Sequence, residues 1–245
     1  NIPIMYPEMD KAIEVILREK VKIVFTSAGN PKLWTPILQK EGVKVTHVVS
    51  SSTFALKAQE AGVDAVVAEG FEAGGHNGRE ETTTLVLVPA VRQHVSIPLI
   101  AAGGIATGRA MLAAMALGAD GVQIGTLFAL AEESSAHEAF KLHCLALDEG
   151  DTKLLLKKLS PTRLAAGAFR TAVEEAEAAG ADAETMSRLL GKGRAKKGIF
   201  EGDLEEGELE IGQASALLSD IRPVAEIMDD LIRGYRRAAD KSYKL

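Results

Sequence analysis

The sequence predicts an α/β fold in which parallel strands alternate with helices. Between residues 20 and 126, short apolar or β-branched runs alternate with longer segments of helical periodicity. The apolar runs are nearly continuous, which is typical of strands covered on both faces. The helical segments carry their own start and stop residues, and Thr107 and Gly118 bracket the clearest of them.

Six strand candidates occur between residue 1 and residue 125. Five are short runs of β-branched and small apolar residues, namely Lys22–Ser27, Lys44–Ser50, Asp64–Glu69, Pro98–Gly103 and Asp120–Gly125. A sixth, Asn1–Met5, is interpreted as the tail of a strand. Alternation with helices indicates right-handed βαβ units and hence a parallel sheet.

Helices are predicted between these strands, near residues 31–41, 53–62, 83–95 and 107–118. In the last of them, Thr107 can cap the first turn and Gly118 ends the helix. An earlier helix, Pro7–Lys20, has acids in its first turn and Arg18 and Lys20 near its end, as the helix dipole favours.

The sheet could be doubly wound or closed into a barrel, and the ends of the last two strands favour the barrel. Both finish in glycine, at Gly103–Gly104 and at Gly125. Barrels commonly bind phosphate at the loops after strands seven and eight. We therefore predict a TIM (β/α)8 barrel whose third strand ends at Asn1–Met5. Strands one and two would precede Asn1, because a barrel without them exposes bare edges.

The chain beyond the last strand predicts an insertion and a closing helix. Helices are expected over residues 130–147, 171–190 and 213–239, whereas Gly191–Gly207, with a basic half and an acidic half, reads as a solvated loop. We divide the chain into a barrel part (1–149), a helical cap insertion (150–210) and a closing barrel helix (211–245).

The composition limits the classes of function. Hydrophobic residues make up 47% and charged residues 25%, as in ordinary globular enzymes. A formal net charge of −6 gives no sign of a nucleic-acid-binding surface. No apolar run reaches the roughly 18 residues that span a bilayer, so no membrane partner is expected. One cysteine, Cys144, excludes an internal disulfide and favours a cytoplasmic location.

The strongest local signal is the segment from Ala68 to Gly78, which reads Ala-Glu-Gly-Phe-Glu-Ala-Gly-Gly-His-Asn-Gly. It follows a strand directly, at the end where barrel active sites form. Its glycines allow the backbone to approach a ligand closely, and His76 can transfer protons near neutral pH. A flexible hairpin with a solvent-facing histidine is the alternative.

A second signal is a pair of glycine turns that predicts a phosphate site. Ala101-Ala102-Gly103-Gly104 leads into the helix capped by Thr107, and Gln123-Ile124-Gly125-Thr126 ends the next strand. Glycine turns that enter a helix offer free N–H groups to an anion. Either turn alone is weak, but adjacent strands would place the two side by side.

Other chemically active residues are given structural roles. His47 lies within a strand and is interpreted as a core or rim residue, and His94, His137 and His143 as surface residues on helices. Cys144 is interpreted as a small buried apolar group. No spacing of His, Cys and acids indicates a metal site.

Together these motifs resemble the nitronate monooxygenase family, formerly the 2-nitropropane dioxygenases, which also contains the flavin-dependent type II enoyl-ACP reductases. The resemblance runs from Asn1 to about Gly212 and is strongest over Ala68–Gly78, Ile100–Gly108 and Gly118–Thr126. It implies a barrel that binds FMN noncovalently.

The resemblance also implies site residues. His76 matches the active-site histidine, and Gly212–Gln213 a pair near the substrate side of the flavin. The implied cofactor-binding residues are Asn1, Glu69, Gly74, Gly75, Gly103, Gly104, Gln123, Ile124, Gly125 and Thr126. Departures from the family pattern occur at Leu127, where Arg is expected, and at Ala165–Ala168, which replaces a basic stretch. The N-terminal Gly-Gly-Met contact to the flavin is not in this sequence.

The first functional hypothesis is an FMN-dependent oxidoreductase that oxidises alkyl nitronates with O2. The alternative is an enoyl-ACP reductase that uses NAD(P)H as co-substrate, and His76 would assist either reaction. Two further alternatives are a phosphate-binding barrel enzyme without flavin and a flavin-binding protein without turnover. The expected partner is a small-molecule substrate, and the resemblance leaves a homodimer open.

Overall fold

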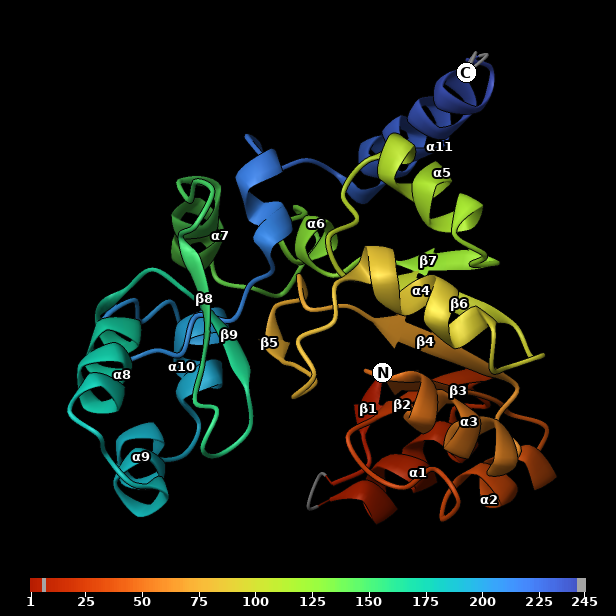
Figure 1. The fold of residues 1–245 in the computed structure, drawn as a ribbon, viewed down its shortest axis with the longest axis horizontal. Coiled ribbons are helices and arrows are strands. Elements are labelled where there is room, and N and C mark those ends of the chain that lie inside the picture. Colours follow the sequence, from red (N-terminus) through yellow and green to blue (C-terminus); the bar gives the residue numbers. More distant parts are fainter. Residues whose placement is uncertain (6–7, 242–245) are drawn as a thin grey trace.

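A computed structural model describes residues 1–5 and 8–241, and its centre is a sheet of six parallel strands (Figure 1). The strands are β1 (Ile2–Pro3), β2 (Ile23–Ser27), β3 (Lys44–Val49), β4 (Ala65–Glu69), β6 (Leu99–Ala102) and β7 (Gly121–Gln123). They lie in chain order, and each pairs in parallel with the next. This confirms the predicted parallel α/β fold, with β1 in the place predicted for strand three.

The helices between these strands confirm the predicted alternation. They are α1 (Met9–Arg18), α2 (Thr35–Lys40), α3 (Ser52–Glu60), α4 (Thr84–Arg92) and α5 (Gly108–Ala116). The Thr107 side chain caps α5 by accepting a hydrogen bond from the N–H of Ala110, as predicted. Pro7, the predicted start of the first helix, lies outside the described residues.

The core explains why the strands read as continuous apolar runs. Val45, Val66, Val67 and Leu99 have no exposed surface. Successive strand residues point to opposite faces of a sheet. Val66 and Val67 are neighbours and both are buried, so β4 is covered on both sides.

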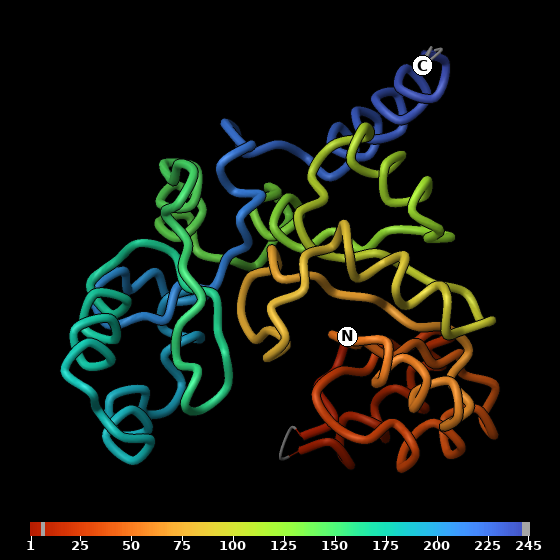
Figure 2. The backbone as a smooth tube through the Cα atoms, viewed as in Figure 1, coloured from red at the N-terminus to blue at the C-terminus, as the bar shows by residue number. Residues whose placement is uncertain are grey.

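The segment 150–210 was predicted to be helical, and the structure corrects this in part. It contains α8 (Ala168–Ala178), α9 (Ala183–Leu190) and α10 (Arg194–Glu201), but also β8 (Thr152–Leu155) and β9 (Thr162–Ala165). With β5 (Gly75–His76), these two strands form an antiparallel sheet in the order β5-β9-β8. Figure 2 shows the chain after β4 leaving the main sheet toward this part of the molecule. The two parts of the chain therefore share a sheet.

The prediction of a loop over Gly191–Gly207 was wrong, because α10 lies within it. Arg194 donates hydrogen bonds to the carbonyls of Leu189 and Leu190 and forms an ion pair with Glu206 at 2.9 Å. Its guanidinium also stacks on the Phe169 ring. The basic half of the segment thus bonds to its acidic half, an arrangement that the order of charges along the chain does not reveal.

Three predicted helices are each interrupted. Residues 130–147 contain only α7 (Glu138–Leu145), preceded by the short α6 (Thr126–Ala129). Residues 171–190 are split between α8 and α9 near Gly180, which has a φ of +80°. Residues 213–239 contain a 3₁₀ helix, η1 (Gln213–Leu217), and then α11 (Val224–Ala239). No helix of residues 1–5 and 8–241 is both long and apolar enough to cross a membrane.

Helix α11 packs against α5 through two glycines. A Cβ atom at Gly108 would overlap the backbone N of Tyr235 and the backbone O of Leu231. A Cβ at Gly234 would lie 3.4 Å from the backbone of Gly108. The two helices can approach this closely only because neither carries a side chain at the crossing.

We predict that Gly108→Ala destabilises the protein, because α11 must move away from α5 to admit the methyl group. Overpacking of this kind costs about 1–3 kcal/mol of unfolding free energy. Gly121→Ala is the matched control, since no atom lies within 4 Å of a Cβ there. Urea unfolding measures both variants. Equal stability of the two would show that the helices do not cross at Gly108.

Candidate functional site

The ends of β4, β6 and β7 open into one cavity of about 90 Å³. Seven of the predicted site residues line it, namely Glu69, Gly74, Gly103, Gly104, Gln123, Gly125 and Thr126. The two glycine turns, predicted from separate strands, therefore meet at one place. Parallel strands bring their carboxyl ends to the same edge of a sheet, and this topology brings the turns together.

Four predicted site residues do not line this cavity. Asn1 is exposed and precedes β1, the opposite edge strand of the sheet. Ile124 is half-buried and packs against the apolar core. Gly75 is buried and His76 exposed, and both belong to β5 in the smaller sheet. The roles of all these residues stay predictions.

The turn after β6 takes a shape that requires glycine. Gly103 and Gly104 have φ values of +97° and +67°. A Cβ at Gly103 would lie 2.8 Å from the hydroxyl of Thr84 and 2.9 Å from the carbonyl O of Gly70. Gly125 differs, because no atom lies within 4 Å of a Cβ there. The space beside Gly125 is open and can admit a ligand.

Glu72 and Thr84 tie the motif after β4 to the turn after β6. The Glu72 carboxylate accepts hydrogen bonds from the N–H of Thr84 at 2.9 Å and from its hydroxyl at 2.9 Å. The same hydroxyl lies 2.9 Å from the carbonyl O of Gly103. Glu72 thus satisfies a free N–H at the start of α4 and fixes the cavity wall.

A second segment, Ile211–Gln213, packs against residues of the cavity wall, and the next residue, Ala214, lines the cavity. Its Gln213 N–H donates to the carbonyl O of Glu72 at 2.9 Å, and its Gly212 N–H donates to the Thr126 hydroxyl at 3.2 Å. A Cβ at Gly74 would overlap the Ile211 backbone. The resemblance placed Gly212–Gln213 near the site, and the structure brings this pair against Glu72, Gly74 and Thr126.

Arg163 joins the smaller sheet to the motif after β4. Its side chain is buried, and two of its nitrogens donate to the carbonyl O of Phe71. Its guanidinium lies 4.4 Å from the centre of the Phe71 ring. Burial lowers the pKa of Arg163. A buried cation is costly unless it is bonded, so these contacts hold the two parts of the chain together.

Three glutamates near this region have pKa values raised to about 7. Burial is the main cause for Glu69 and Glu210. Burial also raises the pKa of Glu208, the charge of Glu210 raises it further, and the charges of His76 and Arg194 lower it. Glu210 packs directly on Gly75, where a Cβ would lie 2.7 Å from its carboxylate. Of these three carboxyl groups, Glu208 is the one whose pKa the charge of His76 lowers, and Glu210 packs on the residue next to His76.

The remaining histidines and the cysteine have mostly structural positions. His47 is buried, its Nδ1 lies 2.8 Å from the Thr26 hydroxyl, and burial lowers its pKa to about 4. His94 and His137 are exposed, as predicted, whereas His143 is half-buried with its Nε2 2.6 Å from the carbonyl O of Ala166. Burial raises the pKa of the Cys144 thiol to about 12, so this thiol is inert near neutral pH.

Sequence reasoning missed Thr84, Glu208 and Glu210. A signal existed for Thr84, because Thr82–Thr84 precedes an apolar helix as capping residues do. The alternation Glu208-Leu209-Glu210 is a strand-like pattern with polar residues on one face, but nothing in it shows that this face is buried. Burial of Glu208 depends on contacts with segments far away along the chain.

Comparisons with known proteins place this geometry in context. A family model described as nitronate monooxygenase matches residues 2–234. The chain is 39% identical over 156 residues to a probable nitronate monooxygenase of Staphylococcus haemolyticus, which covers 59% of this chain and 43% of that protein. The chain spans 43% to 64% of the length of the first curated relatives that it matches.

Solved structures show the same similarity in three dimensions. FabK from Thermotoga maritima superposes with a TM-score of 0.90 at 38% identity, over 97% of this chain and 75% of that one. A nitroalkane oxidase from Streptomyces ansochromogenes superposes with a TM-score of 0.76 at 28% identity, over 94% of this chain and 69% of that one.

We predict that Glu210→Gln weakens the pH dependence of stability. The pKa of Glu210 in the folded chain, about 7, exceeds its ordinary value of 4.5. Its contribution to stability is therefore full below about pH 4 and is lost as pH rises through 7. The variant should recover up to about 3 kcal/mol of that loss between pH 5 and pH 8.

Urea unfolding at both pH values measures this change. Glu149→Gln, at an exposed loop position, is the control and should leave the pH dependence unchanged. An identical pH dependence in the parent and in Glu210→Gln would show that Glu210 is solvated in the folded protein.

Proposed function

The chain belongs to the nitronate monooxygenase family, and on this premise we propose that the protein is an FMN-dependent oxidoreductase that oxidises alkyl nitronates with O2. The observation that carries the proposal is the meeting of two glycine turns, Gly103–Gly104 and Gly125–Thr126, at one cavity. Because the chain spans only part of its relatives, the activity is proposed for the whole protein.

The residues at the cavity fit the phosphate end of FMN. The turn at Gly103–Gly104 has the left-handed backbone of an anion-accepting turn, and the space beside Gly125 is open. The Thr126 hydroxyl is fixed by the Gly212 N–H. When bound, FMN supplies the redox chemistry. The chain supplies the phosphate contacts and the close backbone approach at Gly74.

His76 is proposed to bind the substrate and to move its proton. Its side chain is exposed and therefore accessible to a substrate. The loop that carries it is fixed on the main-sheet side by Glu72 and Thr84, and on the other side by Arg163. A histidine held in this way can act on a substrate above the cavity that Glu69 and Gly74 line.

A second candidate function is the NAD(P)H-dependent reduction of an enoyl thioester. FabK, an enoyl-ACP reductase, is more similar to this chain than the nitroalkane oxidase is, with TM-scores of 0.90 and 0.76. In this reaction His76 would deliver the proton that, with a hydride, completes reduction of the C=C bond of the enoyl thioester. A cytoplasmic location and a homodimer are proposed with either function, from the single cysteine and from the family.

Two reactions distinguish these candidates in the purified flavoprotein. Consumption of O2 with an alkyl nitronate, without NAD(P)H, is the expected result. Oxidation of NAD(P)H that requires crotonyl thioester, without O2 consumption on nitronate, would instead establish the reductase. A protein purified without flavin would contradict both and favour a phosphate-binding enzyme. Retained FMN with neither reaction would favour a flavin-binding protein without turnover.

We predict that His76→Ala retains FMN and lowers turnover at least about 100-fold, the usual effect of losing a general acid or base. FMN should stay bound because His76 does not line the cavity of the glycine turns. Bound flavin is measured by absorbance and turnover by O2 uptake. His94→Ala, at an exposed position in the turn after α4, is the control. Equal turnover of the two variants would remove His76 from the mechanism.

A further inference from the structure

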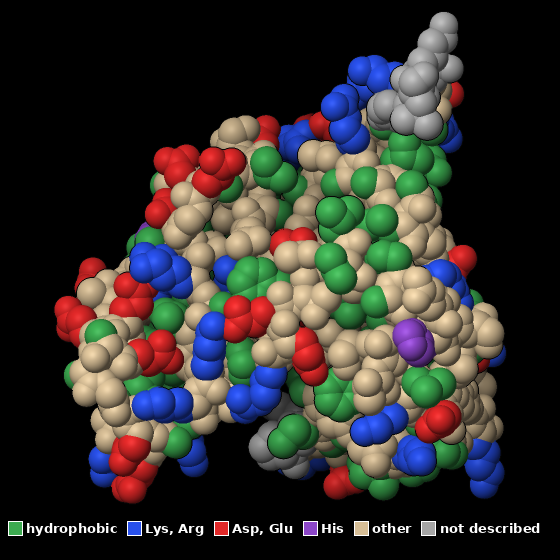
Figure 3. Space-filling view, viewed as in Figure 1, with side chains coloured by type: hydrophobic (Ala, Val, Ile, Leu, Met, Phe, Trp, Pro, Cys, Tyr) green, Lys and Arg blue, Asp and Glu red, His purple; other side chains and the backbone are tan. Residues whose placement is uncertain are grey.

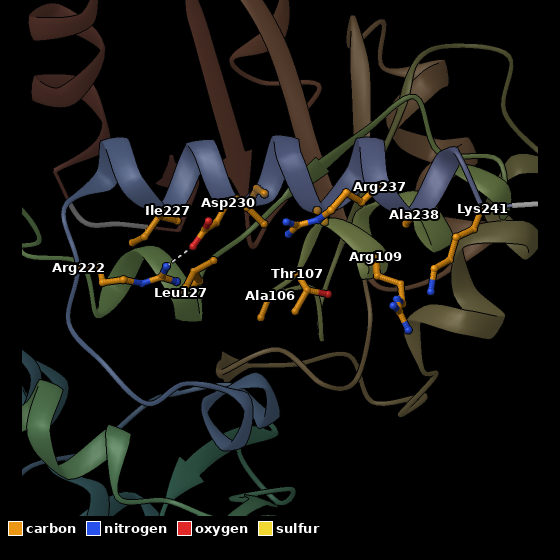
Figure 4. A pocket seen from close by; sticks show the side chains of 13 residues that line it. Ala106, Thr107, Arg109, Leu127, Arg222, Ile227, Asp230, Arg237, Ala238 and Lys241 are labelled. Carbon is orange, nitrogen blue, oxygen red and sulfur yellow. Dashed lines mark hydrogen bonds and ion pairs between the residues drawn. The ribbon is translucent and has the colours of Figure 1, made fainter.

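A second cavity, of about 470 Å³, lies between α5 and α11 (Figure 4). This volume falls within the range of roughly 300–1,000 Å³ that small-molecule sites occupy. Its lining shares no residue with the cavity of the glycine turns. The two cavities lie along consecutive parts of the β6–α5 loop, since Ile105 lines the first and Ala106 lines the second.

The walls of this second cavity are firmly built. The close contact of Gly108 with Gly234 holds α5 against α11 at the crossing. The floor is apolar, and Leu127, Ile227 and Leu231 are almost fully buried there. These three side chains also belong to one packed apolar cluster. The apolar floor of the cavity is therefore already formed in the absence of a ligand.

The rim of the cavity is cationic. Arg109 of α5, Arg237 of α11 and Lys241, which follows α11, line it, and no ion pair of theirs occurs among residues 1–5 and 8–241. The ends of the Arg109 and Lys241 side chains point toward one another in Figure 4. Lys and Arg side chains also gather around the end of α11 in Figure 3.

The single acid of the lining does not neutralise this rim. Asp230 is bonded to Arg222 and, at 2.5 Å, to Arg233. The bonds to Arg233 and Arg222 lower the pKa of Asp230. Its carboxylate therefore stays charged and paired with these two arginines. The cationic rim therefore persists in a chain whose formal net charge is −6. A positively charged rim on a protein of negative net charge attracts an anion.

We propose that this cavity binds an organic phosphate, with its apolar or aromatic body on the Leu127–Ile227–Leu231 floor and its phosphate at Arg109, Arg237 and Lys241. Arginine and lysine are the side chains that bind phosphate oxygens best. A free inorganic anion would leave the apolar floor uncovered, and a cavity of this size accommodates a nucleotide. The site is independent of the proposed oxidoreductase activity.

Calorimetry with the purified protein tests this proposal. The probes are ADP and adenosine 2′,5′-bisphosphate, with adenosine and inorganic phosphate as the two halves of the ligand. We expect at least one nucleotide to bind about tenfold more tightly than either half. Arg109 and Arg237 do not line the cavity of the glycine turns, so variants at these two positions separate binding at the second cavity from binding at the first.

Charge-removing variants locate the site. Arg237→Gln and Arg109→Gln should each weaken nucleotide binding about tenfold, the loss of one charge-assisted hydrogen bond. Arg236→Gln is the matched control, because Arg236 is exposed on the same helix and does not line the cavity. Circular dichroism establishes that each variant is folded.

Three outcomes would overturn the proposal. The first is that neither nucleotide binds to the parent protein. The second is that Arg236→Gln weakens binding as much as Arg237→Gln. The third is that inorganic phosphate binds as tightly as the nucleotides, which would show a surface anion site only. None of these outcomes depends on turnover, so a failure here and a failure of the oxidoreductase proposal are distinguishable.

Discussion

The geometry of the candidate site depends on one buried hydroxyl group, that of Thr84. It lies 2.9 Å from the Glu72 carboxylate, 3.1 Å from the carbonyl O of Ala102 and 2.9 Å from the carbonyl O of Gly103. A buried polar group must find a partner inside the protein. The start of α4, the end of β6 and the motif after β4 are therefore fixed relative to one another. The cavity lies where these three segments meet.

Close packing around the Thr84 hydroxyl explains why the two motifs contain glycine. A need for a flexible backbone explains it less well. A Cβ at Gly70 would overlap the Thr84 hydroxyl and lie 2.7 Å from the Glu72 carboxylate. A Cβ at Gly103 would crowd the same hydroxyl from the other side. The glycines are needed because backbone and side chains are packed around Thr84. The freedom that glycine offers is used at Gly103 and Gly104, whose φ values are positive.

Sequence reasoning reached the features that depend on local patterns. Strands such as β4 are recognisable because both faces are buried, and α5 because Thr107 and Gly118 mark its ends. The pairing of His76 with Thr162 joins residues far apart in the sequence, and no local sequence pattern predicts it. Helix α10 was missed because Arg194 bonds to carbonyl groups and to Glu206, and these contacts exist only once the chain has folded.

The long-range pairing also changes which part of the chain controls the proposed chemistry. The glycine turns belong to the six-stranded sheet, whereas His76 belongs to β5 and pairs with β9. The backbone of His76 is therefore held by the segment between residues 150 and 210, through its pairing with β9 and through the hydrogen bonds from Arg163 to Phe71. Barrels change chemistry by varying the loops at their active face. In this protein the segment between residues 150 and 210 contributes a strand, β9, that pairs with His76. A change in β9 would thus move His76 without touching any residue that lines the cavity.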